Sequence, residues 1–307
     1  MENLNLNSPH FSNEDKAREY LEKIRWVNGV ECPHCGTIGG HYSLTGKSTS
    51  NKPVRKGTWK CRKCRKQFSV TVGTVFERSH VPLNKLLIAI YLLCSSKKGM
   101  SAHQLHRMLG ITYKSAWFMA HRIRHAMVTL PNSKKMTGIV EADETYVGGK
   151  GRGKRGRGSE KKVPVFSLVE RNGNVLSTRV ERVTAKNLKG IIRDNVDKTS
   201  VIMTDDFKSY IGLKREFVGH EVIKHSKKEY VRGDIHTNTA EGYFSLLKRG
   251  IIGVYHHVDK HHLHRYLTEF DFRYNNRKRC DADNAMTAII ASKGKRLMYR
   301  DSSGVSK

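Results

Sequence analysis

The sequence has few acidic residues for its length. Its 307 residues include 28 Asp and Glu against 57 Lys and Arg, which gives a formal net charge of +29 and a pI near 10. This charge lies far above the roughly 2–8 that keeps a small domain soluble, and the natural partner of so basic a chain is a polyanion. We predict nucleic acid rather than an anionic membrane surface, because no strongly amphipathic basic helix stands out.

Long apolar runs are also missing. The longest run, from Leu86 to Cys94, is too short to span a bilayer, and no signal peptide opens the chain. These absences predict a cytoplasmic protein with no membrane partner. The 37% hydrophobic content is enough for two or three folded modules.

Cysteines are few, but four of the six form two Cys-x-x-Cys pairs separated by 25 residues. In a cytosolic chain such pairs indicate a metal before a disulfide. Each turn supplies two thiolates, as tetrahedral zinc requires, and four thiolates leave no open position for chemistry. The pattern predicts one structural Zn²⁺ in a zinc ribbon, held by Cys32, Cys35, Cys61 and Cys64.

Helical patterns lie on both sides of this module. A capped helix with Ser12 as its N-cap is expected at the N-terminus. After the cysteines, a short helix should begin at Ser101 and end at Gly110, with a second helix after a tight turn. Helix, glycine turn and helix form the helix-turn-helix pattern, although a plain helical hairpin fits equally well. The basic charge and the upstream cysteine module favour DNA reading, and the candidate contacts on the second helix are Lys114, Arg122 and Arg124.

Strand patterns begin beyond residue 133. The predicted order is three strands, helix, strand, helix, strand, helix, with Asn172-Gly173 as a hairpin turn. This is the order of an RNase H-like α/β domain, a mixed sheet flanked by helices. A Gly-, Arg- and Lys-rich loop at 148–162 should be a flexible arm that clasps phosphates, or else a solvated loop without contacts. The arm's candidate DNA contacts are Arg152, Lys154, Arg155 and Arg157.

Three acids could meet in this domain. Asp143 lies in the first strand, Asp205 ends the fourth strand, and Glu241 follows 36 residues later on a helix. Three carboxylates at one point repel unless cations lie between them, and Mg²⁺ or Mn²⁺ suits such a cluster. A pair of these ions is the usual arrangement for phosphodiester chemistry.

Neighbouring acids leave alternatives in both strands. Glu141 shares a face with Asp143, because a strand alternates faces, and it could be the ligand instead. Asp205 and Asp206 are not separated by periodicity. Both strand positions therefore stay open at the level of sequence.

The helix acid has an alternative too. With Asn238 as N-cap, Glu241 falls at the third helical position, which is a capping box. Lys248 lies seven residues after Glu241, so the two share one helix face about 10 Å apart. In this arrangement Glu241 would bind a metal ion, and Lys248 would bind the neighbouring DNA phosphate.

Three segments, "VEADETYVGGK", "IMTDDFKSY" and "HTNTAEGYFSLLKRGIIGVYHHV", resemble the D-D-E transposases of bacterial insertion sequences. More narrowly, the chain is similar to the ISXO-like group, whose RNase H-like domain follows a zinc ribbon. The resemblance covers roughly residues 28–280.

The resemblance implies roles for particular residues. Asp143 and Asp205 would be the first two catalytic acids, and Lys248 the lysine after the third position. The group carries Glu or Asn at that third position; the spacing to Lys248 favours Glu241, and Asn238 is the alternative. Other candidate DNA contacts near this helix are Arg249 and His257.

The implied activity is metal-dependent cleavage of DNA at terminal inverted repeats and transfer to target DNA, by a homodimer or higher oligomer. A non-catalytic zinc-ribbon regulator and a host nuclease of the same fold are the alternatives. The expected modules are an N-terminal helix at 1–27, a zinc ribbon at 28–78, a helix-turn-helix region at 80–131, a catalytic domain at 136–292 and a basic tail at 293–307.

Overall fold

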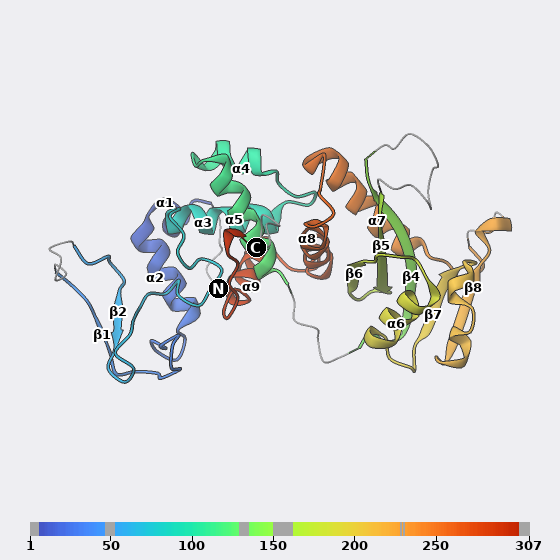
Figure 1. The fold of residues 1–307 in the computed structure, drawn as a ribbon, viewed down its shortest axis with the longest axis horizontal. Coiled ribbons are helices and arrows are strands. Elements are labelled where there is room, and N and C mark those ends of the chain that lie inside the picture. Colours follow the sequence, from blue (N-terminus) through green and yellow to red (C-terminus); the bar gives the residue numbers. More distant parts are fainter. Residues whose placement is uncertain are drawn as a thin grey trace. The chain divides into compact units, whose positions relative to one another are not determined.

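The computed structural model describes residues 6–46, 53–128, 135–149, 162–227, 229 and 231–300. Two compact units divide the chain (Figure 1). No helix within these described ranges is both long and apolar enough to cross a membrane. The first unit comprises Met1–Ser96, Met100–Met127 and Arg279–Lys307, and the second comprises Lys97–Gly99 and Val128–Lys278.

The first unit opens with two helices rather than one. Pro9 begins α1 (Pro9–Ser12), and a separate helix α2 (Glu14–Arg25) follows. The side chain of Asn13 accepts hydrogen bonds from the N–H groups of Asp15 and Lys16, so Asn13 caps α2. The prediction of Ser12 as the cap is wrong by one residue, because Pro9 starts a turn of its own that ends at Ser12.

A small sheet and four further helices complete this unit. Antiparallel strands β1 (His41–Ser43), β2 (Trp59–Cys61) and β3 (Gln67–Phe68) lie in that order. The helices are α3 (Leu83–Ser95), α4 (Ala102–Leu109), α5 (Tyr113–Ala126) and α9 (Asp281–Ile290).

The predicted pair of short helices is present with its expected limits. Ser101 caps α4 by accepting from the N–H of Gln104, and Gly110 ends it in the left-handed region at φ 57°. Helix α9 falls within the catalytic domain expected at 136–292, but it packs against α3 in the first unit. The catalytic domain expected at 136–292 therefore includes a helix that the second unit does not contain.

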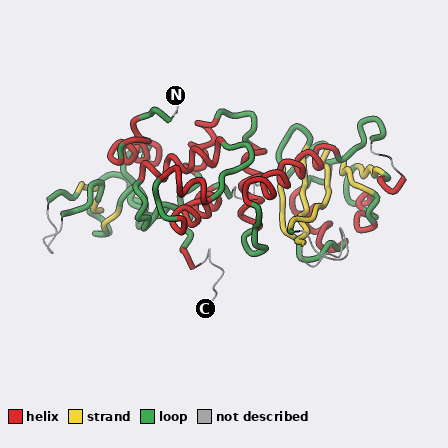
Figure 2. Tube along the Cα trace, turned by 90° about the horizontal axis from the view of Figure 1, so that it is seen from above, coloured by secondary structure: helices red, strands yellow, loops and turns green. Residues whose placement is uncertain are grey.

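The second unit is built on a mixed five-stranded sheet in the order β6-β5-β4-β7-β8 (Figures 1 and 2). β4, β5 and β6 are antiparallel neighbours, while β7 and β8 run parallel to β4. The strand order and the helices on its faces agree with the predicted mixed α/β domain. The strands are β4 (Ile139–Gly148), β5 (Lys162–Glu170), β6 (Val175–Arg179), β7 (Val201–Asp205) and β8 (Gly219–Ile223).

Each face of the sheet is covered by its own helices. Helix α6 (Ala185–Asn195) packs on one face over Val140, Ala142 and Ile202. Helices α7 (Asn238–Gly250) and α8 (Leu263–Asn275) pack on the other. The helix predicted between β7 and β8 is absent from the described chain there; two 3₁₀ turns replace it, separated by Gly212 at φ 93°.

Candidate active site and metal-binding residues

Two carboxylates lie on neighbouring parallel strands and on the same face of the sheet: Asp143 within β4 and Asp205 at the end of β7. β4 pairs with β7 so that Glu141 lies opposite Met203. Asp143 and Asp205 each stand two residues further along, so both point to the face of that pair, which is the face covered by α7. The parallel register brings the two predicted acids together at one edge.

The acids next in sequence to Asp143 and Asp205 accept hydrogen bonds from other parts of the second unit. Asp206 accepts a hydrogen bond from the hydroxyl of Ser226, which follows β8. Glu144 points to the opposite face, where it accepts a 2.6 Å hydrogen bond from the hydroxyl of buried Tyr210. These contacts favour Asp205 over Asp206.

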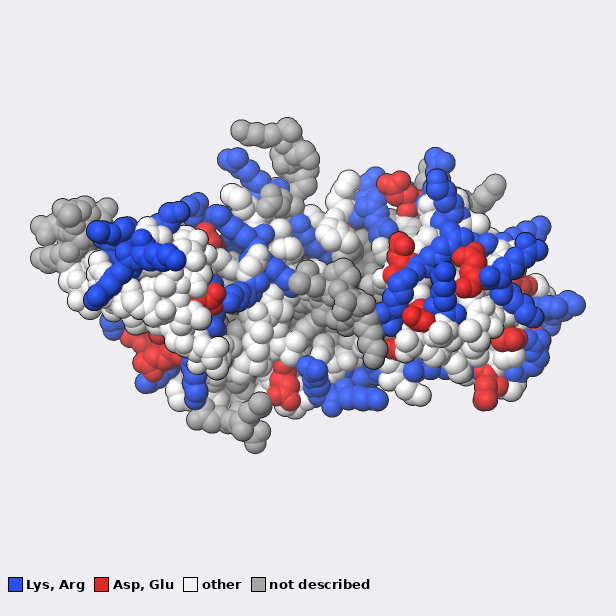
Figure 3. Space-filling model, turned by 90° about the horizontal axis from the view of Figure 1, so that it is seen from below, with Lys and Arg blue, Asp and Glu red and all other residues white. Residues whose placement is uncertain are grey.

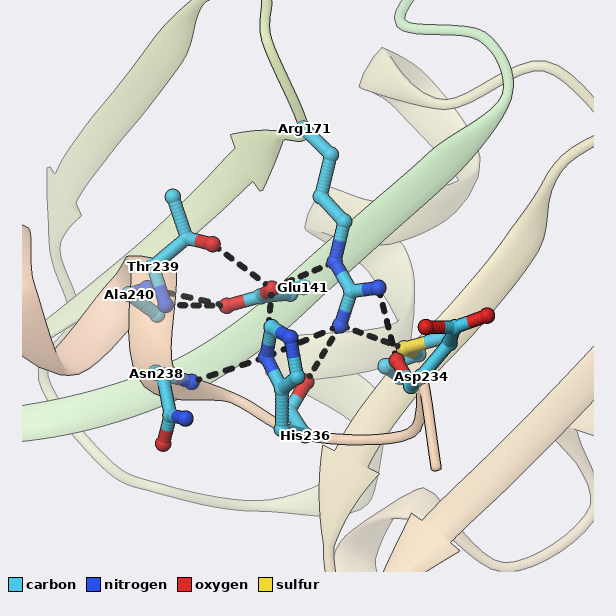
Figure 4. A network of polar contacts seen from close by, with 8 residues as sticks. Glu141, Arg171, Asp234, His236, Asn238, Thr239 and Ala240 are labelled. Carbon is cyan, nitrogen blue, oxygen red and sulfur yellow. Dashed lines mark hydrogen bonds and ion pairs between the residues drawn. The ribbon is translucent and has the colours of Figure 1, made fainter. Parts of the chain in front are cut away.

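Glu141 is fully buried and contacts the first turn of α7 (Figure 4). Its carboxylate accepts hydrogen bonds from the N–H groups of Thr239 and Ala240 and from Nε of Arg171. Sequence reasoning missed Arg171, because nothing in local spacing marks a residue that reaches a strand acid 30 positions away.

Helix α7 presents a stripe of polar side chains to an open cavity of about 690 Å³. Glu241, Ser245 and Lys248 line it at helical spacing, together with Asp143 of β4. Asn238 is the first residue of α7 and not its cap, and the side chain of the cap residue Thr237 makes no capping hydrogen bond. The capping box, which the sequence left open as the alternative for Glu241, is therefore not formed with Asn238 as its cap; the carboxylate of Glu141 accepts from this turn instead.

Burial raises the pKa of Asp143 to about 7, and the nearby charges of Glu144, Asp205 and Glu241 act in the same direction. A hydrogen bond of 2.7 Å from the N–H of Glu144 opposes them. These three mutually repelling acids, Asp143, Asp205 and Glu241, present the hard oxygen ligands that Mg²⁺ and Mn²⁺ prefer. The donor set fits such ions.

This repulsion predicts that Asp143→Asn stabilises the zinc-loaded protein when no Mg²⁺ or Mn²⁺ is added. The folded-state pKa of about 7 exceeds the ordinary value of 3.8, so the wild type loses stability as pH rises through that interval. The variant should gain about 4 kcal/mol at pH 8 and about 2 kcal/mol at pH 5. Urea unfolding at both pH values measures the difference, and an equal gain at both would contradict the prediction.

The second metal-binding set consists of the four cysteines. Their sulfurs all lie within 4.8 Å of one another, and the Cys32–Cys64 and Cys35–Cys61 sulfur pairs are 3.7 Å apart. Tetrahedral zinc with Zn–S bonds of about 2.3 Å places its sulfurs about 3.8 Å apart, so the set fits zinc. Across the described ranges, no other group of potential ligands converges this closely, so the three carboxylates are spaced more widely.

The candidate DNA contacts on α5, the second short helix, differ in their exposure to solvent. Lys114 is exposed, with its ammonium 4.7 Å above the ring of Tyr299. Arg122 and Arg124 are buried at 9% and 2% exposure, and the guanidinium of Arg122 lies 4.4 Å above Phe118. The expectation that both arginines reach phosphates is corrected, because both side chains are buried within the first unit.

Other basic residues lie on the second unit. Arg249 and His257 are exposed, and Arg249 lines the cavity that holds Asp143. Figure 3 shows Lys and Arg side chains over much of the face drawn there. The predicted arm residues, Arg152, Lys154, Arg155 and Arg157, lie outside the described residues.

Two families match the chain. Residues 135–275 match the ISXO2-like transposase domain, and residues 12–67 match the transposase zinc-ribbon domain. A protein in transposable element ISH50 of Halobacterium salinarum is 31% identical over 286 residues, which cover 86% of this chain and 91% of that protein.

Two further likenesses are weaker. A transposase-like protein of Haemophilus influenzae is 29% identical over 102 residues, covering 33% of this chain and 81% of that protein. The crystal structure of a pre-cleavage Mos1 transpososome aligns with 68% of this chain and 79% of that chain at 13% identity. Its TM-score of 0.25 is too low to support an argument.

The zinc-ribbon match, the transposase-domain match and the relative in a transposable element place the chain in the class of insertion-sequence transposases, and the four converging cysteines and the mixed sheet agree with it. The chain belongs to the transposase family with the ISXO2-like domain, and it acts on DNA. The resemblance inferred from the sequence is thereby confirmed.

Proposed function

We propose that the chain cleaves DNA at the terminal inverted repeats of an insertion sequence and joins the freed 3′ end to target DNA. Asp143, Asp205 and Glu241 are the catalytic acids. The single observation that carries the proposal is the parallel register of β4 and β7, which brings Asp143 and Asp205 to one face beside the helix of Glu241.

The three acids would hold Mg²⁺ or Mn²⁺ ions, which activate the attacking oxygen and stabilise the leaving oxygen in phosphodiester chemistry. Lys248 lies two turns beyond Glu241 along the same cavity, where its ammonium can bind the neighbouring DNA phosphate. Arg249 adds a second cation for the same backbone.

The rest of the chain would bring the DNA to this site. We assign Lys114 and the arm residues of 150–161 to phosphate contacts, and His257 to the DNA near the catalytic helix. Because an element has two ends, the active form is at least a homodimer. A purely regulatory protein would have no need of a buried Asp143 whose pKa is raised further by Asp205 and Glu241 beside an open cavity.

Cleavage of supercoiled plasmid tests the function. With Mg²⁺ or Mn²⁺, the protein should nick DNA at the end of the element's inverted repeat and leave plasmid without the repeat intact. Binding of the repeat without nicking would point to a regulator, and nicking regardless of the repeat would point to a host nuclease.

The third acid can be identified by paired substitutions. Glu241→Gln should slow nicking by about 10²-fold or more, because Glu241 lines the cavity with Asp143. Asn238→Ser should cleave within about threefold of wild type, since among the described lining residues the cavity includes Glu241 and not Asn238. Initial nicking rates on the same plasmid give the comparison; the reverse pattern would make Asn238 the third ligand.

A further inference from the structure

The helix that carries Glu241 is capped by the strand that carries Asp143. Oε2 of Glu141 accepts the N–H groups of Thr239 at 2.8 Å and Ala240 at 3.0 Å, and Oε1 accepts the Thr239 hydroxyl at 2.8 Å (Figure 4). The first N–H groups of a helix lack intrahelical acceptors, and a carboxylate there is also favoured by the helix dipole. The cap is therefore supplied from 98 positions away.

Arg171 connects this carboxylate to the chain that leads into the helix. Its Nε donates to Oε1 of Glu141 at 2.7 Å, one terminal nitrogen donates to the Asp234 carbonyl at 2.7 Å, and the other to the His236 carbonyl at 3.0 Å. The same nitrogen lies 2.9 Å from Nδ1 of His236, which must accept because a guanidinium only donates. The planar guanidinium group donates in fixed directions, so it holds the Glu141 carboxylate and the segment that leads into α7 in a fixed relative position.

Both carboxylate oxygens of Glu141 are fully used. Oε1 accepts from Arg171 and the Thr239 hydroxyl, and Oε2 accepts two N–H groups, while the side chain is 0% exposed. Glu141 is thus unsuited to bind an ion, although it shares a face with Asp143. Its effect on the site must pass through the position of α7.

We propose that Glu141 and Arg171 are positioning residues that hold Glu241 at the distance from Asp143 that divalent cations require. The inference rests on the proposed function of those two acids. Glu141 lies two residues before Asp143 on β4 and binds the turn of α7 that directly precedes Glu241. A short segment of β4, the Glu141 carboxylate and the first turn of α7 therefore connect Asp143 to Glu241.

The test is Glu141→Gln in the full-length, zinc-loaded chain. Calorimetric titration with Mn²⁺ should give about tenfold weaker binding, because an amide cannot accept all four hydrogen bonds and α7 loses its fixed position. Hydrogen exchange at the amides of Thr239 and Ala240 should become faster. A matched control is Glu269→Gln, since Glu269 is also 0% exposed and pairs with Arg273 at 2.7 Å on α8. This control should lower the melting temperature while leaving Mn²⁺ affinity and both amides unchanged.

If Glu141→Gln does not fold, Arg171→Lys is the alternative variant. Lysine keeps the positive charge but lacks the planar guanidinium that donates to several acceptors at once. It should also weaken Mn²⁺ binding. Unchanged Mn²⁺ affinity in a folded variant of this pair, or an equal loss in Glu269→Gln, overturns the positioning role. Asp143→Asn in the same titration separates the two hypotheses. If Asp143→Asn abolishes Mn²⁺ binding while Glu141→Gln and Arg171→Lys leave it unchanged, the positioning role fails. If Asp143→Asn also leaves Mn²⁺ binding unchanged, the proposed ion site fails, and the positioning role fails with it.

Discussion

Asp143→Asn is expected to lower the rate of strand cleavage by about 10³-fold or more and to leave DNA binding at least as tight as in the wild type. Ions bound by the proposed acids would supply several kcal/mol of transition-state stabilisation, and each 1.36 kcal/mol is a factor of ten. Binding survives because the change removes a negative charge beside the DNA backbone. The measurements are plasmid nicking with Mn²⁺ and a mobility shift with the inverted repeat. Asp205→Asn should behave in the same way.

The matched control is Asp206→Asn, which alters the residue next to Asp205. The Asp206 carboxylate accepts from Ser226 on the β8 side and does not share the face of Asp143. Its nicking rate should stay within about twofold of wild type. Normal cleavage by Asp143→Asn, or equal loss in Asp206→Asn, would falsify the assignment of the acids.

The second large effect is expected from loss of zinc. Cys61 is fully buried at the end of β2, and its sulfur is 3.7 Å from that of Cys35. A structural zinc site contributes about 10–16 kcal/mol of apparent binding free energy, which in a module this small is folding free energy. Cys61→Ser should therefore bind no zinc and unfold the region around the cysteines. Metal analysis and hydrogen exchange over residues 30–70 measure both effects.

Cys280→Ser provides the control for that experiment. Cys280 is exposed at the N-cap of α9, where serine is a favourable residue. The control should keep about one zinc ion per chain and the wild-type exchange pattern. A Cys61→Ser protein that retains zinc, or a metal-free region that stays folded, would contradict the structural role.

Local spacing in the sequence was enough for the features that depend on one segment at a time. The two Cys-x-x-Cys turns predicted four converging sulfurs, and the strand period placed Glu141 and Asp143 on one face. The helical period likewise placed Glu241 and Lys248 along one cavity. These patterns repeat within a few residues, because a strand alternates every second residue and a helix turns every 3.6.

Tertiary structure separated the members of each ambiguous set by the contacts that their side chains make. Glu141 could not be told from Asp143 until the first turn of α7 was seen to donate to the Glu141 carboxylate, and Asp206 is distinguished by its hydrogen bond from Ser226, which follows β8. Arg122 has the same charge as exposed Lys114 on the same helix, yet it is buried, with its guanidinium over the Phe118 ring.

The physical reason is common to these cases. Periodicity determines which side of an element a residue occupies, so the sequence by itself determined the module types, the zinc ligands and a short set of candidate acids. What covers each side is determined by elements far away in the chain. The cap of α7 comes from 98 positions away, and α9 completes the first unit from the opposite end of the sequence. Only the folded structure could therefore separate the acids that face the cavity from the acid that holds the helix in place.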